Sequence, residues 1–207
     1  PEGKAAIGFV SSGLAYGYLA QALHELGLSG KLPILKLGLT YPVDESAVRS
    51  LAERCEHLMV VEERRGFIQE QIAAILTVDR QNGLPSGTAQ LWGKQFPGGK
   101  PGLPETYGLH PSIMLEKLVE LLQMLQGKTQ ISLDVDTADL QRHVDENNAT
   151  ASIEGLLPAL PPRTPSFCPG CPHRDSASLC LDIKRRFMDA TYMSRRHKRK
   201  PVDLLFH

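Results

Sequence analysis

The stretch AAIGFVSSG, residues 5–13, decides the fold class of this 207-residue chain. Its apolar run is short and uninterrupted, which is typical of a strand inside a parallel sheet. Ser-Ser-Gly then ends the run with residues that favour a tight turn and the start of a helix. The next residues, 14–27, place apolar side chains on one helical face and end at Gly27, a common helix stop. We therefore expect a strand, a turn and a helix in this order.

The same order repeats twice more along the first third of the chain. Residues 32–40 and 57–63 are strand-like runs, and helix-like stretches follow each of them at 41–55 and 66–76. Asp44 stands where the N-cap of the second helix is expected. Three strands alternating with three helices predict an α/β fold in which helices flank a parallel sheet.

The pattern weakens beyond this region, and a long stretch rich in glycine and proline follows. We expect a first domain at residues 1–78 and a connector at 79–160, which contains one helix at about 111–126. A proline-rich strip then leads into residues 161–207, where we expect the truncated start of a second α/β domain.

Composition restricts the classes of function. The formal net charge is zero, so no overall field attracts nucleic acid or an anionic membrane. No apolar run approaches the roughly 20 residues of a membrane span. Four cysteines do not form the pattern of a secreted disulfide framework, so we expect a cytoplasmic protein. Because strand-like runs stand almost at the start of the chain and at its end, VDLLFH (202–207), we expect a segment of a longer polypeptide.

Two charged runs can be interpreted either as binding sites or as solvent-exposed turns and loops. VVEERRG (60–66) places paired carboxylates at the end of a predicted strand, where ligands gather in open α/β sheets, but an exposed charged turn is favoured. RRHKRK (195–200) has the charge to contact phosphate or an anionic partner, but a solvated loop is the more common interpretation.

The strongest chemical signal is the turn SFCPGCPH, residues 166–173. Cys168 and Cys171 are spaced so that both sulfurs can face one metal ion. Pro172 suits the first position of a helix, and a helix N-terminus favours thiolate. Four interpretations remain open: a dithiol redox site, a structural zinc site, a four-iron cluster and a plain turn. A zinc site needs further ligands, for which His173, Cys180 and His197 are available.

Several stretches together resemble one family of enzymes. PPRTPSFCPGCPHRDSASLCLDIKRRF (161–187) resembles the opening of the thiamine-pyrophosphate domain in the large subunit of indolepyruvate:ferredoxin oxidoreductases. GFVSSGLAYGYLAQAL (8–23) and PILKLGLTYPVDES (33–46) resemble the transketolase C-terminal-like domain that precedes it. LWGKQFPGG (91–99) resembles the connecting region. The resemblance extends over nearly the whole chain and is most specific at the cysteine turn.

The resemblance implies a function for the whole protein. Such enzymes decarboxylate a 2-oxoacid, here an aryl one such as indolepyruvate, with thiamine pyrophosphate and Mg²⁺. Electrons leave through iron–sulfur clusters to ferredoxin, and coenzyme A takes the acyl group. By match to the family motif, Cys168 and Cys171 are expected to be ligands of a 4Fe-4S cluster. Gly170, Pro172 and His173 are expected to lie beside the thiamine cofactor, and a smaller second subunit or domain is the expected partner.

The resemblance also indicates what this segment lacks. In the family, the Mg²⁺ and diphosphate motif lies downstream of the turn, and the carboxylate that activates thiamine lies in an earlier domain. We therefore expect the 207-residue chain alone to be inactive. The alternative, from a non-catalytic class, is a zinc-stabilised α/β interaction module that uses Cys168 and Cys171. A dithiol reductase ranks last, because the motif does not follow the first strand of the sheet.

Overall fold

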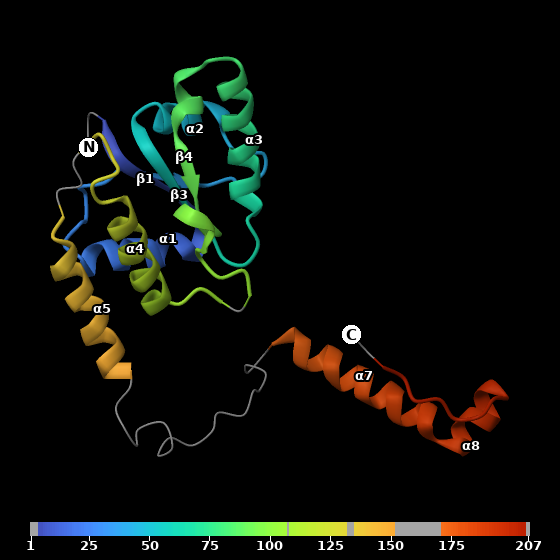
Figure 1. The fold of residues 1–207 in the computed structure, drawn as a ribbon. Coiled ribbons are helices and arrows are strands. Elements are labelled where there is room, and N and C mark those ends of the chain that lie inside the picture. The colour runs from blue at the N-terminus through green and yellow to red at the C-terminus, as the bar shows by residue number, and fades with distance from the viewer. Residues whose placement is uncertain (1–3, 107, 132–134, 152–170, 206–207) are drawn as a thin grey trace. The chain divides into compact units, whose positions relative to one another are not determined.

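The computed structural model of the chain describes residues 4–106, 108–131, 135–151 and 171–205. The chain divides into two compact units, Pro1–Ile153 and Glu154–His207, and each is described by itself. Figure 1 shows that the first unit is a sheet with helices on both of its faces. In the described part of the chain, no helix is long and apolar enough to cross a membrane.

The larger sheet has four strands, all parallel, in the order β2-β1-β3-β4. In the centre of the sheet, Val10 of β1 is level with Leu35 of β2 and with Val60 of β3. The predicted α/β fold with a parallel sheet is therefore confirmed. The strands are β1 (Ala5–Ser12), β2 (Ile34–Leu37), β3 (Cys55–Val61) and β4 (Gln90–Trp92).

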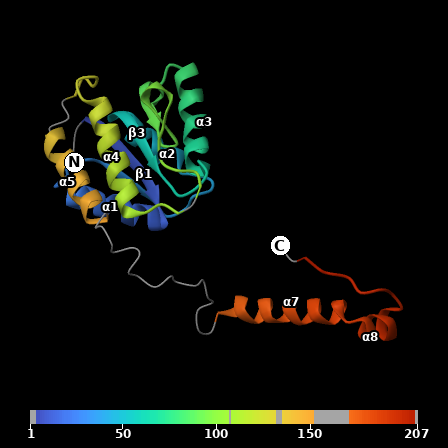
Figure 2. The same cartoon turned by 60° about the horizontal axis from the view of Figure 1, so that its bottom comes forward.

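Each face of the sheet is covered by its own layer of helices (Figures 1 and 2). Ile7 and Phe9 of β1 belong to a core shared with α1, α4 and α5, whereas Val10 belongs to a second core shared with α2 and α3. Because alternate residues of a strand point to opposite faces, a strand covered on both sides must be apolar throughout. The helices are α1 (Gly13–Glu25), α2 (Glu45–Ala52), α3 (Phe67–Gln81), α4 (Pro111–Leu125) and α5 (Thr137–Ala151).

The predicted start and stop signals of the helices are confirmed. The side chain of Asp44 accepts a hydrogen bond of 3.1 Å from the backbone N–H of Ala47, which caps α2. Gly27 follows the end of α1 with a positive φ of 65°, a conformation that glycine adopts without strain. The predicted helix at about 111–126 is α4, which has proline at its first position.

The middle of the chain contributes more to the first unit than the weak sequence pattern suggests. Part of the expected connector, 79–160, supplies β4 to the sheet and helices α4 and α5 to one face. Leu118 and Leu122 of α4 are fully buried in the core between these helices and the sheet. β4 is only three residues long, too short to show the alternation by which a strand is recognised. The remaining short elements here are η1 (Pro85–Thr88), β5 (Gln95–Phe96), η2 (Pro97–Gly99) and β6 (Lys100–Pro101).

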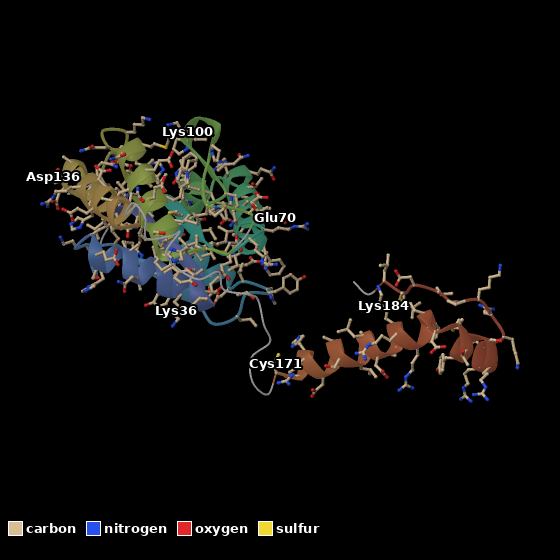
Figure 3. The ribbon with its side chains drawn as sticks, turned by 90° about the horizontal axis from the view of Figure 1, so that it is seen from below. Lys36, Glu70, Lys100, Asp136, Cys171 and Lys184 are labelled. Atoms are coloured by element: carbon tan, nitrogen blue, oxygen red, sulfur yellow. The ribbon has the colours of Figure 1, made fainter. Side chains whose placement is uncertain are left out.

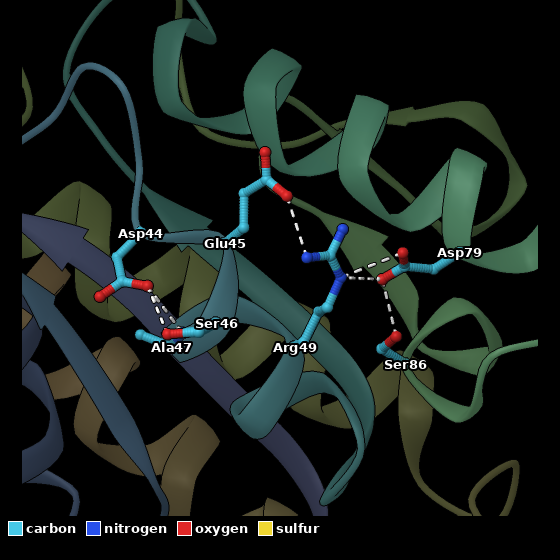
Figure 4. A network of polar contacts seen from close by, with 7 residues as sticks. All are labelled: Asp44, Glu45, Ser46, Ala47, Arg49, Asp79 and Ser86. Atoms are coloured by element: carbon cyan, nitrogen blue, oxygen red, sulfur yellow. Dashed lines mark hydrogen bonds and ion pairs between the residues drawn. The ribbon is translucent and has the colours of Figure 1, made fainter.

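A buried carboxylate ties together the elements on the other face (Figure 4). Asp79 of α3 is 1% exposed and accepts hydrogen bonds from Arg49 Nε on α2, at 2.9 and 3.1 Å. The hydroxyl of Ser86 in η1 donates to the same carboxylate at 2.7 Å. The Arg49 guanidinium holds the pKa of Asp79 below its ordinary value. One carboxylate thus joins three segments that are separate in the sequence.

The second unit is described from residue 171 to residue 205. Its main element is α7 (Pro172–Met188), and Pro172 occupies the predicted first helical position. Shorter turns follow as α8 (Ala190–Tyr192) and η3 (Met193–His197). The interpretation of VDLLFH as strand-like is wrong for Val202–Leu205, because the described residues of this unit provide no strand to pair with. Instead, the backbone N–H of Val202 donates to the carbonyl of Phe187 at 2.9 Å.

Candidate functional site

The candidate site of the cysteine turn lies at the N-terminus of α7 (Figure 3). Cys171 is the N-cap residue, with φ −70° and ψ 122°, and Pro172 begins the helix. The Cys171 sulfur lies 3.5 Å from Nδ1 of His173, the second residue of the same helix. The first N–H groups of a helix have no intrahelical partner, so this position favours a negatively charged sulfur. The structure therefore brings a thiol and an imidazole together at a helix N-terminus.

The other predicted residues of the turn, Cys168 and Gly170, lie outside the described residues. The donor chemistry of the turn still fits an iron–sulfur cluster, because such clusters are held by cysteine thiolates. Cys55 is buried in the core beneath α2 in the first unit, and burial raises the pKa of its thiol to about 11.

Of the further ligands considered for a zinc site, His173 lies beside Cys171, but Cys180 and His197 do not. Cys180 lies nine residues along α7, which corresponds to a rise of roughly 13 Å. The His197 ring belongs to η3 and packs at 5.1 Å from the Phe187 ring near the other end of the helix. Among the described residues, no group of three or more His, Cys, Asp or Glu side chains is placed to hold a metal ion.

At the carboxyl end of β3, the interpretation of VVEERRG as an exposed turn is wrong for Glu62. This side chain is buried and accepts hydrogen bonds from the backbone N–H groups of Ile68, at 2.7 Å, and Gln69, at 2.9 Å. It therefore caps α3 from within the fold, where the preceding Gly66 has no side chain to do so. Burial raises the pKa of Glu62.

Lys94 lies at the same edge of the sheet and was not identified from the sequence. Its ammonium donates to the carbonyl oxygens of Glu62, at 2.9 Å, and Pro104, at 3.3 Å. The side-chain oxygen of Gln69 accepts from the Lys94 backbone N–H at 2.9 Å. Burial lowers the pKa of Lys94. No periodic signal marks this lysine, because its partners come from segments up to 32 residues away.

A cavity of about 300 Å³ opens beside Glu62, between the start of α1 and the start of α3. It lies at the carboxyl edge of the parallel sheet, the edge at which open α/β folds commonly bind ligands. Both carboxylate oxygens of Glu62 are occupied by α3, so this group supports the wall of the cavity and is not a free base.

In the second unit, the basic run RRHKRK begins in η3 and continues past its end, and its side chains are exposed to solvent. This agrees with a solvated loop. Lys198 has a left-handed backbone, with φ 54°, where the chain leaves η3.

Comparison with known proteins gives one consistent result. A family model described as "Indolepyruvate oxidoreductase domain" matches residues 1–146. The indolepyruvate oxidoreductase subunit IorA of Methanothermobacter thermautotrophicus is 31% identical over 169 residues, which are 81% of this chain and 21% of that protein. IorA of Methanothermobacter marburgensis is 30% identical over 84% of this chain and 22% of its own length. IorA of Thermococcus kodakarensis is 29% identical over 84% of this chain and 23% of its own length. The chain thus spans about a fifth of the length of these curated relatives.

Proposed function

Because this chain belongs to the indolepyruvate oxidoreductase domain family, we propose that it is part of the large subunit of an enzyme that oxidatively decarboxylates an aryl 2-oxoacid such as indolepyruvate. The family match over residues 1–146 is the observation that carries this proposal. In each turnover, the bond between the keto carbon and the carboxylate breaks and CO₂ leaves. A bond from the keto carbon to the sulfur of coenzyme A forms, and one proton and two electrons are released. Ferredoxin is the proposed electron acceptor.

The cofactors proposed for the whole protein are thiamine pyrophosphate with Mg²⁺ and a 4Fe-4S cluster. When bound, the thiamine stabilises the carbanion left by decarboxylation and the cluster accepts single electrons. Cys168 and Cys171 would hold the cluster. Gly170, Pro172 and His173 would lie beside the thiamine. This proposal is supported by the position of Cys171, whose sulfur lies where a helix N-terminus stabilises negative charge.

For the first unit we propose a structural role in this enzyme. Its cores bury β1 and β3 on both faces, and Glu62 and Lys94 at the carboxyl edge are already paired within the unit. The proposal therefore assigns no catalytic residue to positions 4–151. A smaller second subunit and the rest of the large subunit would supply the remaining binding groups.

The proposed activity is tested with the full-length protein, purified without oxygen. With indolepyruvate, coenzyme A, thiamine pyrophosphate and Mg²⁺, we expect it to reduce methyl viologen, which can be followed by absorbance. The 207-residue chain alone should show no activity above background under the same conditions. Omission of coenzyme A is the control, since the acyl group then has no acceptor. Turnover by the isolated chain, or no turnover by the full-length protein, would contradict the proposal.

A further inference from the structure

The fourth strand of the sheet is short and lies at its edge. β4 has three residues and pairs with β3 on one side only, in the register His57–Gln90 and Met59–Trp92. A short edge strand gains little stability from so few ladder hydrogen bonds. Side-chain contacts between β3 and β4 are therefore important for keeping this strand in place.

One such contact joins His57 of β3 to Trp92 of β4. The indole Nε1–H of Trp92 donates to Nδ1 of His57 at 3.0 Å. The two rings also stack, with centroids 6.1 Å apart and an interplanar angle of 29°. Trp92 is partly buried against the core beneath α1 and α4, and His57 is 9% exposed. The contact is thus partly buried, which limits the access of water that would compete for its hydrogen bond.

This hydrogen bond fixes the protonation state of the imidazole. An indole N–H is only a donor, so Nδ1 of His57 must accept and cannot carry a proton. His57 is therefore neutral, with its proton on Nε2. A second proton would have to go to Nδ1, where it would face the indole N–H. Protonation and the His57–Trp92 hydrogen bond exclude each other.

We infer that the His57–Trp92 pair is a pH-sensitive latch that holds β4 on the sheet. At pH values above the range in which His57 gains its second proton, the latch is closed. As the pH falls, the imidazole gains its second proton, the hydrogen bond is lost, and β4 separates more often from β3. This device is independent of the proposed enzymatic function.

Burial sets the direction in which the pKa of His57 moves, and the charged groups around it act against this or are already paired. Burial lowers the pKa of His57 below its ordinary value, and Glu56 on the same strand opposes this to a smaller extent. Glu56 is itself occupied, since its carboxylate accepts from the backbone N–H groups of Gln130 and Ile131 at 2.8 and 2.9 Å. The other titratable side chains around the adjacent cavity of about 690 Å³ are Lys4, Glu53, Arg54, Cys55 and Lys128.

The sign of the effect follows from proton linkage. His57 binds a proton less readily when β4 is closed than when it is open, so acid favours the open state. The stabilisation of the closed state is complete above the ordinary histidine pKa of about 6.5 and is lost as the pH falls below it.

Opening of β4 would also affect the carboxyl edge of the sheet. Lys94 follows Trp92 by two residues, and its ammonium donates hydrogen bonds to the carbonyl oxygens of Glu62 and Pro104. Release of β4 would therefore loosen the lysine that lies next to the start of α3. The latch thus connects a histidine near the amino edge of the sheet to the wall of the 300 Å³ cavity at the opposite edge.

Hydrogen exchange of the 207-residue chain tests the latch directly. Protection factors, which are corrected for the intrinsic effect of pH, are measured for the amides of β4 at pH 7.5 and pH 5.5. We expect them to fall by about fivefold at the lower pH, the scale set by one hydrogen bond. The amides of β1 serve as an internal reference and should keep their protection. The fluorescence of Trp92, the single tryptophan of the chain, should change over the same pH range.

Two variants distinguish the latch from general acid sensitivity. In His57→Gln, the side-chain oxygen can still accept from Trp92 but does not titrate, so the protection of β4 should not depend on pH. His24→Gln removes an exposed histidine of α1 and should leave the wild-type response unchanged. If His57→Gln does not fold, Trp92→Phe replaces it and should give low β4 protection at both pH values.

Either of two results overturns the inference. One is unchanged β4 protection in the wild type between pH 7.5 and 5.5, even if the fluorescence changes. The other is the same fall of protection in His57→Gln.

Discussion

Replacement of Cys171 by serine in the full-length protein is expected to reduce indolepyruvate-dependent dye reduction by more than about 100-fold. Loss of groups that merely orient metal ligands typically costs 10–100-fold in activity, and loss of a ligand itself should cost more. The variant should also lose the broad visible absorption of a thiolate-held iron–sulfur centre. Anaerobic activity and absorbance, measured on the same preparation, check both expectations.

The matched control is Cys180→Ser on the same helix. Cys180 lies nine residues beyond Cys171 along α7, so it cannot share a site with the turn. This variant should keep its absorption and its activity within about twofold. Equal losses in both variants would indicate a general defect of α7, and unaffected Cys171→Ser would remove the cysteine turn from the proposed site.

The second large effect is expected from Asp79→Asn, which should lower the free energy of unfolding of the 207-residue chain by about 2–4 kcal/mol. The change keeps the size of the side chain but removes the charge that Arg49 faces. It also disturbs the acceptor of the Ser86 hydroxyl. Urea denaturation followed by circular dichroism measures the effect, provided that the denaturant dependence stays the same in both proteins.

The matched control for Asp79 is the other carboxylate that contacts Arg49. Glu45 forms an ion pair with Arg49 at 2.9 Å, but its side chain is 61% exposed. Exposed pairs of this kind contribute little, so Glu45→Gln should cost less than about 0.5 kcal/mol. A similar cost in the two variants would contradict the role assigned to the buried Asp79.

The pH dependence of Asp79 has a definite sign. The Arg49 guanidinium lowers the pKa of the native carboxyl, so the unfolded state binds a proton more readily. The stability that Asp79 contributes is therefore present above its ordinary pKa and is lost as the pH falls below that value. Asp79→Asn should lack this part of the acid dependence, which the same denaturation experiment measures at several pH values.

The sequence predicted those parts of the fold that depend on local patterns. The apolar runs of β1 and β3, the Asp44 cap and the start of α7 at Pro172 each follow from neighbouring residues. Their physical causes are burial on both faces of the sheet, side-chain capping and the fixed backbone angle of proline.

Features that depend on distant partners were not predictable in this way. β4 is too short to show a period, and it becomes a strand because β3 offers an open edge. The sequence around Glu62 predicts an exposed charged turn. In the structure its carboxylate is buried and accepts a hydrogen bond from the start of α3. Asp79 owes its role to Arg49, 30 residues earlier in the chain.

The candidate site was predictable in its chemistry but not in its assembly. The spacing of Cys168 and Cys171 indicated a metal or redox site, and α7 begins where the turn required. The structure adds the contact between Cys171 and His173. Which ligands complete the site depends on segments distant in sequence, and local spacing carries no information about them.

The central claim is that the cysteine turn belongs to an iron–sulfur, thiamine-dependent oxidoreductase. The most direct test is to measure iron, acid-labile sulfide, zinc and thiamine pyrophosphate in the full-length protein after purification without oxygen. The account predicts iron and sulfide in equal amounts, bound thiamine pyrophosphate and no stoichiometric zinc. Protein that holds one zinc ion per chain, without iron or thiamine, would contradict it.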